Sequence, residues 1–410
     1  MKRAVTLAAT MLPGMALAGP CDGEACNLAT LKPVFAQLEA ARTGAAGAHP
    51  VHIVQIGDSH TAGDVLTGAW RDLLQARYGV GGRGVLAPGR PWDGYITRGV
   101  TASMSPGWRV AATFGKGSEN GPVPLGLSSY ALTSTQPGAT IGLASDTPAM
   151  DFDRFVLCAM AGPNAPTLTV RLGRVDQRIA LDAPSPTPRC TTLHSAAPQA
   201  SVLVTAGDRP ATITSWATFR DQGGVALSNL GVIGAQLQHF GRTDDAVIAE
   251  ELRAYTSDLI VLAFGTNEGF MPRFDPKAYE AGLRGQIDRL RTLAPGVPLL
   301  LLGAPDALTR NQALRDNADA ALVGCPDAGS PPLFAPPALG RVRAIQRDVA
   351  RQLGIAFWDW QAAMGGPCAA ARWTDAVPPL MRPDHVHFRW PGGQALAARL
   401  QADLDRAMSE

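Results

Sequence analysis

A short segment near the N-terminus could supply a nucleophile. Val51 to Ile56 form a β-branched, apolar run that ends in Gly57-Asp58-Ser59, and a helical pattern of apolar residues follows. This order predicts a buried strand, a tight turn and a helix. Ser59 would then lie at the carboxyl end of the strand, with its N–H at a helix start that favours negative charge. A hydroxyl in this position can act as a nucleophile once a base accepts its proton.

A candidate base lies near the C-terminus, in Asp384-His385-Val386-His387. Asp384 precedes His387 by three residues, a spacing that in a helical turn brings the carboxylate and the imidazole to one face. We predict that His387 is the general base and that Asp384 holds its ring in the correct tautomer. His385 is the alternative base, but no acidic residue stands three positions before it.

An attacked carbonyl becomes an oxyanion, which needs hydrogen-bond donors. Candidate donors follow two other apolar runs. Gly231-Val232-Ile233-Gly234 forms a glycine turn, and Asn267 follows the apolar run 259–264. A glycine lets the backbone approach a substrate closely. We predict three donors, which are the N–H groups of Ser59 and Gly234 and the side-chain amide of Asn267. Gly231 is the alternative to Gly234, and an Asn after a strand can also simply form a turn.

These four blocks, in this order, resemble the SGNH or GDSL-type hydrolases, a family named for a Ser, a Gly, an Asn and a His. The resemblance implies that Ser59 is the nucleophile and that Asp384 and His387 complete its triad. It also implies that Gly234 and Asn267 form the oxyanion hole together with the Ser59 N–H.

Apolar runs alternate with helical patterns in the C-terminal half, which predicts an α/β fold with a doubly wound parallel sheet. The resemblance specifies a three-layer α/β/α sandwich. Ligands bind beyond the carboxyl ends of such strands, where Ser59, Gly234 and Asn267 are expected. The glycine-rich loop 79–84 follows a helix rather than opening one, so we expect a loop near the cleft and no phosphate site. The apolar runs span 259–264, 298–302 and 355–359, and the helical patterns span 245–254, 279–293 and 341–353.

The segment 103–222 lacks helical periodicity. Short β-type runs recur there between Gly, Pro, Asn and Asp. Many short strands at this spacing predict an all-β sandwich or jelly roll. We therefore expect a hydrolase domain in two parts, 27–102 and 223–410, with an inserted β module between them. Such a module resembles a carbohydrate-binding module, although it could equally be a rigid rim that shapes the cleft. The runs span 108–114, 139–143, 155–160, 168–172, 177–181, 201–205 and 211–217.

The N-terminus predicts export. Lys2 and Arg3 precede an apolar run that closes with Ala16-Leu17-Ala18, as in a signal peptide over residues 1–18. The mature chain should begin near Gly19, in the periplasm or outside the cell. The run is too short to span a bilayer, so we expect no stable membrane insertion. A formal net charge of +1 over 410 residues gives no reason to expect nucleic acid as a partner.

All six cysteines follow the predicted cleavage point, and an even number in an exported chain favours disulfides. Fifteen pairings are possible for six cysteines. Proximity in the sequence favours Cys21–Cys26, Cys158–Cys190 and Cys325–Cys368. No close Cys/His sets recur, so we expect neither a zinc site nor another cofactor.

The predicted function follows from these pieces. The Gly-Asp-Ser-His-Thr form, the β module and the segment 358–366 resemble one branch of the family, exported esterases that remove acetyl groups from peptidoglycan. We expect a serine esterase that removes O-acetyl groups from a cell-envelope polysaccharide, peptidoglycan above others, through an acetyl-enzyme. The alternatives are an O-acetyltransferase with the same site, a lipase or thioesterase, and a glycan-binding scaffold with little catalysis. The sequence does not indicate the oligomeric state.

Overall fold

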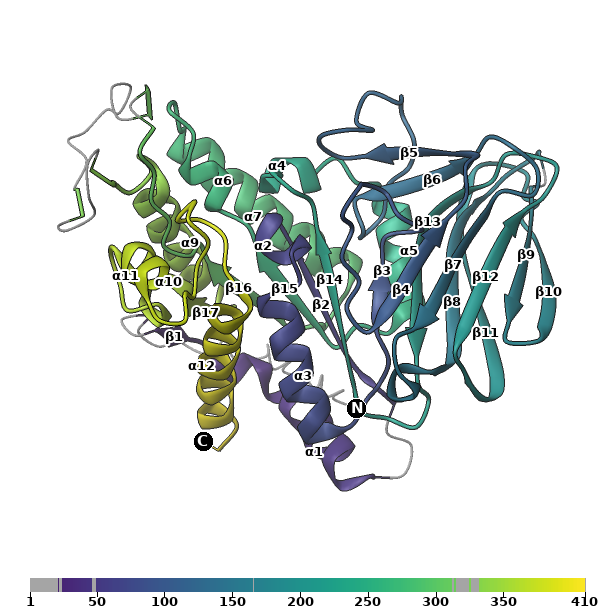
Figure 1. Ribbon diagram of the computed structural model, residues 1–410, viewed down its shortest axis with the longest axis horizontal. Coiled ribbons are helices and arrows are strands. Elements are labelled where there is room, and N and C mark those ends of the chain that lie inside the picture. The colour runs from purple at the N-terminus through teal and green to yellow at the C-terminus, as the bar shows by residue number, and fades with distance from the viewer. Residues whose placement is uncertain are drawn as a thin grey trace, which may run out of the picture.

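A computed structural model describes residues 21, 24–45, 49–164, 166–311, 313–314, 324–325 and 332–409. The predicted signal peptide, residues 1–18, and its cleavage site lie outside these ranges. Figure 1 shows two parts side by side, a sheet surrounded by helices and an antiparallel β part. In the described ranges, no helix is long and apolar enough to cross a membrane.

The first part is built on a six-stranded sheet in the order β1-β17-β16-β15-β2-β14. Five strands are parallel, and only the two-residue edge strand β1 runs antiparallel to its neighbour β17. Every residue of the five parallel strands is buried, which explains their near-continuous apolar sequences. The strands are β1 (Ala25–Cys26), β2 (Val51–Gly57), β14 (Val225–Gly231), β15 (Leu259–Ala263), β16 (Leu299–Gly303) and β17 (Ala356–Asp359).

Helices cover both faces of this sheet, as expected for three layers. One face packs Ile53 against Trp70 and Leu400, and it is covered by α1 (Lys32–Thr43), α3 (Leu66–Tyr78) and α12 (Trp390–Ser409). The other face packs Ile56 against Ile287, and it is covered by α5 (Asp245–Tyr255), α7 (Pro276–Leu293) and α9 (Leu339–Leu353). Shorter helices are η1 (Leu28–Leu31), α2 (Ser59–Ala62), α4 (Leu237–Phe240), α6 (Thr266–Gly269), α10 (Trp360–Ala363) and α11 (Ala369–Asp375).

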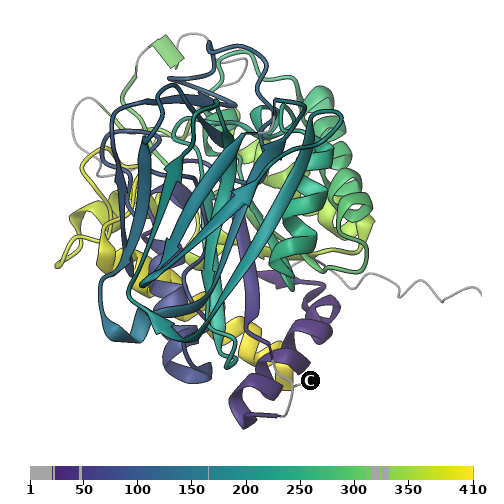
Figure 2. The same cartoon turned by 90° about the vertical axis from the view of Figure 1, so that its right-hand side faces the viewer.

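The second part consists of two antiparallel sheets, one of which faces the viewer in Figure 2. Phe155, Trp216 and Val204 belong to the apolar core that they share. All seven predicted runs form strands, and four further strands, β3, β4, β6 and β11, were not predicted. One sheet contains β4 (Val100–Met104), β7 (Thr140–Ser145), β9 (Thr167–Leu172), β10 (Val175–Ala180) and β12 (Ser201–Ala206). The other contains β3 (Gly84–Leu86), β5 (Trp108–Ala112), β6 (Tyr130–Ser134), β8 (Phe152–Ala161), β11 (Thr187–Gln199) and β13 (Thr212–Phe219), and η2 (Pro148–Met150) precedes β8.

The β part is fastened to the first part through α5. The buried Glu251 carboxylate accepts hydrogen bonds from the hydroxyls of Thr214 (2.6 Å) and Ser215 (2.5 Å) and from the Leu127 N–H (2.7 Å). Burial raises the pKa of Glu251, although these bonds oppose the rise. The two parts therefore share a buried polar junction. The domain boundaries at 103 and 222 stay a prediction.

The position expected for the glycine-rich loop 79–84 is wrong. Val80 pairs with Val225, and the Gly81 N–H donates to the Val225 carbonyl at 2.9 Å. Val225 is the first residue of β14, so this loop lies at the amino edge of the sheet. The glycines permit close packing there, because a Cβ on Gly81 would lie 2.8 Å from the Val225 backbone.

The favoured disulfide pairing is confirmed. Cys158 of β8 bonds to Cys190 of β11, and Cys325 bonds to Cys368 immediately before α11. Cys21 bonds to Cys26 of the edge strand β1.

Candidate active site

Ser59 lies at the carboxyl end of β2, as its sequence position predicted. Asp58 caps α2, and its Oδ1 accepts the His60 N–H at 2.9 Å. This places the Ser59 N–H at the first position of the helix. The Ser59 Oγ lies 3.0 Å from the His387 Nε2.

His387 is held from its other side by Asp384. The Asp384 Oδ2 lies 2.9 Å from the His387 Nδ1, and its Oδ1 accepts the N–H groups of Val386 and His387, each at 2.9 Å. Burial raises the pKa of Asp384, but these bonds and the imidazole outweigh it, so the pKa is lowered. The structure therefore joins Ser59, His387 and Asp384 in one chain of contacts.

The loop that carries this pair is not the helical turn that the spacing predicted. His385 adopts the left-handed region with a φ of 56°, and the carboxylate closes the loop by capping the N–H groups beyond it. The backbone carbonyl of His385 accepts the Leu308 N–H, and its side chain is buried. Of the two histidines, His387 is the one that touches Ser59.

The candidate oxyanion donors lie just beyond the carboxyl ends of β14 and β15, the two strands that flank β2. Asn267 is in α6, directly after β15, and its Nδ2 donates to the Ala235 carbonyl at 2.9 Å, which leaves a second N–H on the amide. Gly234 follows β14 with a φ of 77°, and no acceptor for its N–H occurs among the described residues. A Cβ on Gly231 would clash with the backbone of Ala62, so this glycine allows β14 to pack against α2.

His60 is a buried part of the site that the sequence analysis missed. Its Nδ1 lies 3.2 Å from the Asp58 Oδ1, and its Nε2 lies 2.9 Å from the Val386 carbonyl. Its ring stacks on that of His387 with centroids 5.4 Å apart. Burial lowers the pKa of His60, but Asp58 and the Val386 carbonyl outweigh it, so the pKa is raised. His60 therefore fastens the Ser59 helix to the His387 loop.

Glu268 links the loops of the two oxyanion candidates. Its Oε1 accepts the Leu237 N–H at 2.7 Å, while the Gln236 side chain donates to the Asn267 carbonyl at 3.4 Å. Burial raises the pKa of Glu268 to about 7. A cavity of about 210 Å³ beside it is lined by Phe274 and Tyr279, among others.

The β part reaches the site through the loop after β5. Phe114 lies about 3.0 Å from where a Cβ on Gly234 would be, and its ring stacks on His239 at 4.2 Å. The Arg242 side chain donates to the Thr113 carbonyl at 3.0 Å. The inserted strands therefore contribute a wall beside the Gly234 loop.

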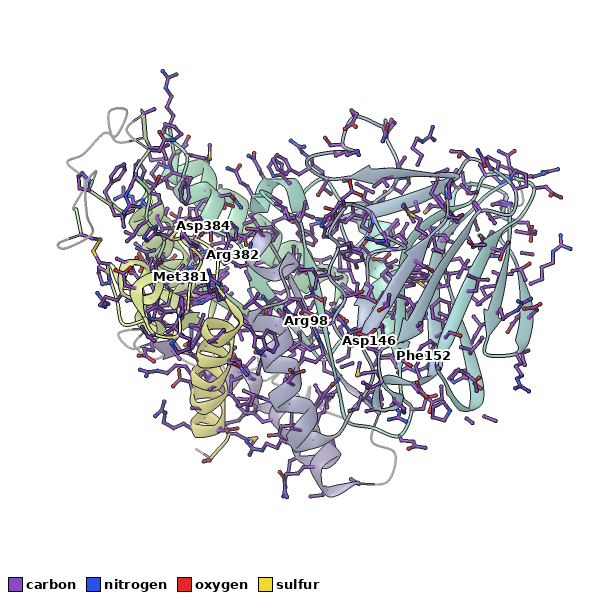
Figure 3. The ribbon with its side chains drawn as sticks, in the orientation of Figure 1. Arg98, Asp146, Phe152, Met381, Arg382 and Asp384 are labelled. Carbon is purple, nitrogen blue, oxygen red and sulfur yellow. A yellow bond between two sulfur atoms is a disulfide. The ribbon has the colours of Figure 1, made fainter. Side chains whose placement is uncertain are left out.

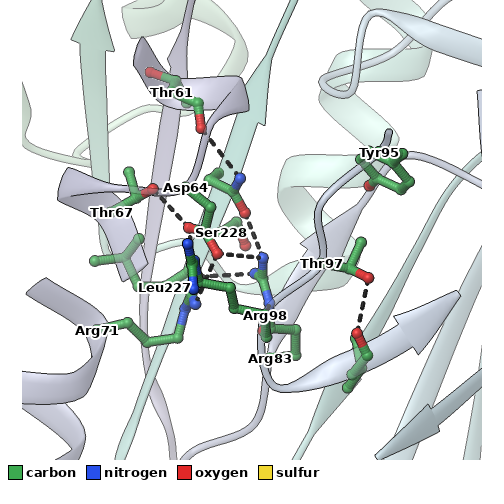
Figure 4. Close-up of polar contacts among 12 residues, drawn as sticks. Thr61, Asp64, Thr67, Arg71, Arg83, Tyr95, Thr97, Arg98, Leu227 and Ser228 are labelled. Carbon is green, nitrogen blue, oxygen red and sulfur yellow. Dashed lines mark hydrogen bonds and ion pairs between the residues drawn. The ribbon is translucent and has the colours of Figure 1, made fainter. Parts of the chain in front are cut away.

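Behind the site, a buried charged network holds the end of α2 against β14 (Figure 4). Asp64 pairs with Arg71 at 2.7 Å and with Arg83 at 3.4 Å, and the Asn229 side chain donates to the Thr61 carbonyl at 3.1 Å. Burial and the neighbouring Arg71 lower the pKa of Arg83 to about 10. Two cations beside one carboxylate make this network a net positive region below the surface.

Comparison with known proteins identifies the type of domain. Residues 194–395 match the model of the GDSL-like Lipase/Acylhydrolase family. This part of the chain, just under half of its length, matches a GDSL-type acylhydrolase domain. The matched range holds Gly234, Asn267, Asp384 and His387, while Ser59 lies outside it, on the other side of most of the β part.

The chain is also similar to a solved structure described as "Peptidoglycan O-acetylesterase in action, 5 min". The two share 26% identity over 96% of this chain and 99% of that one, with a TM-score of 0.74. A family two carbohydrate esterase from Cellvibrio japonicus shares 13% identity over 76% of this chain and 98% of that one, with a TM-score of only 0.28. No curated protein matches the sequence significantly. The fold is that of the SGNH hydrolases, with a mixed sheet and additional antiparallel strands, and the chain is an esterase of the acylhydrolase type.

Proposed function

We propose that this chain is a serine esterase that removes O-acetyl groups from a cell-envelope polysaccharide, with peptidoglycan as the favoured substrate. The observation that carries the proposal is the contact chain from the Ser59 Oγ through His387 to Asp384, at 3.0 Å and 2.9 Å. A hydroxyl, an imidazole and a carboxylate in this order are the components of nucleophilic acyl transfer.

The proposed reaction begins when the Ser59 Oγ attacks the acetyl carbonyl and its proton passes to the His387 Nε2. Asp384 stabilises the imidazolium that forms. The N–H groups of Ser59 and Gly234 and the Asn267 amide receive the oxyanion. The intermediate collapses to acetyl-Ser59, and His387 returns the proton to the departing sugar hydroxyl. Water, deprotonated by His387, then attacks the acetyl carbonyl. The bond between the acyl carbon and the Ser59 Oγ breaks, acetate leaves, and His387 returns the proton to the Ser59 Oγ.

Two observations support the substrate class. The similar structure is named as a peptidoglycan O-acetylesterase. Three disulfides fit a periplasmic or secreted protein, which is where the predicted signal peptide would direct the chain. We further propose that the β part is a carbohydrate-binding-like sandwich whose Phe114 loop shapes the rim of the cleft.

The test measures acetate released by the mature protein from O-acetylated peptidoglycan, acetylated xylan and a long-chain p-nitrophenyl ester, with Ser59→Ala as the control. We expect Ser59-dependent release, fastest from peptidoglycan. Faster turnover of the long-chain ester would favour a lipase, and transfer of acetyl groups to glycan hydroxyls without acetate release would favour a transferase. Binding of peptidoglycan with no Ser59-dependent activity would favour a scaffold.

A further inference from the structure

A groove of about 720 Å³ borders the loop that carries Asp384. Its lining includes Arg98, Arg382, Arg389 and Trp390, which we call the arginine groove. Arg98 precedes β4 of the β part. Arg382 and Arg389 lie on either side of the Asp384–His387 loop, and Trp390 is the first residue of α12. Figure 3 labels Arg98, Arg382 and Asp384 and shows that they come from these separate segments.

Among the residues that the structure describes, no acidic side chain pairs with the guanidinium groups of the arginine groove. Within the described ranges, none of the three arginines forms an ion pair, and the Arg389 guanidinium donates only to the Met381 carbonyl, at 3.3 Å. Asp384 also lines the groove, but both of its oxygens are occupied by Val386 and His387. Asp72 on α3 lies close enough to feel the charge of Arg98 without pairing with it. In a chain with a net charge of +1, the groove is thus a local excess of positive charge.

One of these guanidiniums is held in position before any ligand arrives. Arg98 lies over the Trp390 ring, 4.4 Å from its centroid. Both side chains pack on Gly68 of α3, where an added Cβ would lie 3.2 Å from the Arg98 Cδ and 3.3 Å from the Trp390 ring. A cation fixed on an aromatic face loses less conformational freedom on binding.

We propose that the arginine groove binds carboxylate groups of the acetylated polymer while its acetyl ester lies at Ser59. This inference rests on the proposed esterase function, and it adds that the substrate is anionic. The planar guanidinium presents paired N–H donors that match a carboxylate, and two or three of them side by side suit a polymer with repeated carboxylates. The carboxylates can belong to the sugars or to a peptide attached to them, because the groove chemistry is the same.

The test compares wild type with an Arg98→Gln/Arg382→Gln variant. The readout is the kcat/KM for acetate release from O-acetylated peptidoglycan divided by that for neutral acetylated xylan. We expect this ratio to fall by about tenfold at low ionic strength, and by less at high salt, because exposed charges are screened. An Arg98→Lys/Arg382→Lys variant should recover part of the ratio, since it keeps the charge but loses the paired donors.

A matched control removes the same charge elsewhere. Arg291 and Arg351 are exposed in the last turns of α7 and α9, at the amino edge of the parallel sheet and away from the cleft, and Arg291→Gln/Arg351→Gln should leave the ratio unchanged. A second arm uses peptidoglycan from which an amidase has removed the peptides. If the Arg98→Gln/Arg382→Gln variant still lowers the ratio on this glycan, the bound carboxylates belong to the sugars. If it lowers the ratio only when the peptides are attached, they belong to the peptides.

An unchanged ratio in Arg98→Gln/Arg382→Gln, or an equal fall in the control, would overturn the inference. If wild type releases no acetate from peptidoglycan, the proposed substrate fails, and the same variants are then compared on acetylated polygalacturonate. A fall on that carboxylate polymer supports the groove even though peptidoglycan is excluded, and no fall overturns it.

Discussion

His387 makes one contact with each of its ring nitrogens, and these two contacts define the chemistry of Ser59. A proton held on Nδ1 by Asp384 leaves Nε2 free to accept the proton of the serine hydroxyl. Asp384 keeps its charge because the hydrogen bonds of the loop and the imidazole outweigh its burial and lower its pKa. The capped loop therefore provides both the geometry and the ionisation state that a general base requires.

The first prediction concerns these three residues. Ser59→Ala and His387→Ala should each abolish p-nitrophenyl acetate hydrolysis, because one removes the nucleophile and the other its base. Asp384→Asn should retain a small residual rate, since the base remains without its oriented proton. Steady-state kinetics measure the effect, and circular dichroism checks that each variant is folded. A wild-type rate in His387→Ala would rule out the assigned base.

Asn267 provides a second prediction. Asn267→Ala should lower kcat by about 10²–10³-fold with little change in KM, because the amide contacts the oxygen mainly in the transition state. Asn164→Ala, in an exposed turn of the β part, should leave both constants unchanged. A comparable rise in KM with kcat unchanged would mean that Asn267 binds the ground state and is not an oxyanion donor.

Glu268 gives a prediction about pH. Its pKa is raised from 4.5 to about 7 in the folded chain, so the native state binds this proton more tightly than the unfolded state does. Wild type should therefore lose stability as the pH rises from about 4.5 to about 7. Glu268→Gln should lack this loss, because the amide keeps an acceptor for the Leu237 N–H without ionising. Urea unfolding at several pH values tests this, and parallel pH profiles for the two proteins would contradict it.

At the scale of elements, the sequence predicts those strands whose burial shows in their own apolar residues. The buried strands β2, β15, β16 and β17 have near-continuous apolar sequences, and Ser59 and Asn267 follow two of them directly. In the unpredicted strand β11 only Leu193 is buried and two of the residues are prolines, so it has no apolar signature. Likewise, the contact of His60 with the Val386 carbonyl joins residues 326 positions apart, which no local pattern encodes.

The junction between α5 and the β part provides the fourth prediction. Glu251→Ala would leave the Thr214 and Ser215 hydroxyls and the Leu127 N–H buried without their acceptor, which should lower the free energy of unfolding by about 2–4 kcal/mol. Glu280→Ala, which removes a partly exposed carboxylate from α7, should change it by less than about 1 kcal/mol. Urea unfolding compares the two, and equal losses would show that the junction contributes no special stability.

At the scale of the whole molecule, the fold brings together chemistry that the sequence keeps far apart. Ser59 and His387 are 328 positions apart, and the strands of the β part lie between them. That part is packed on α5 and places Phe114 beside the Gly234 loop, so it belongs to the architecture of the site. The α/β layers and the order of the four blocks could be predicted from the sequence, whereas the rim of the cleft depends on packing between segments.

The central claim is that Ser59 carries the acetyl group during turnover. Its most direct test is acid quenching during p-nitrophenyl acetate hydrolysis, followed by mass spectrometry of the peptide that contains residues 51–64. We predict one acetyl group on Ser59 in wild type and none in Ser59→Ala or His387→Ala. An acetyl group on another residue during turnover, or undiminished hydrolysis by Ser59→Ala, would contradict the account.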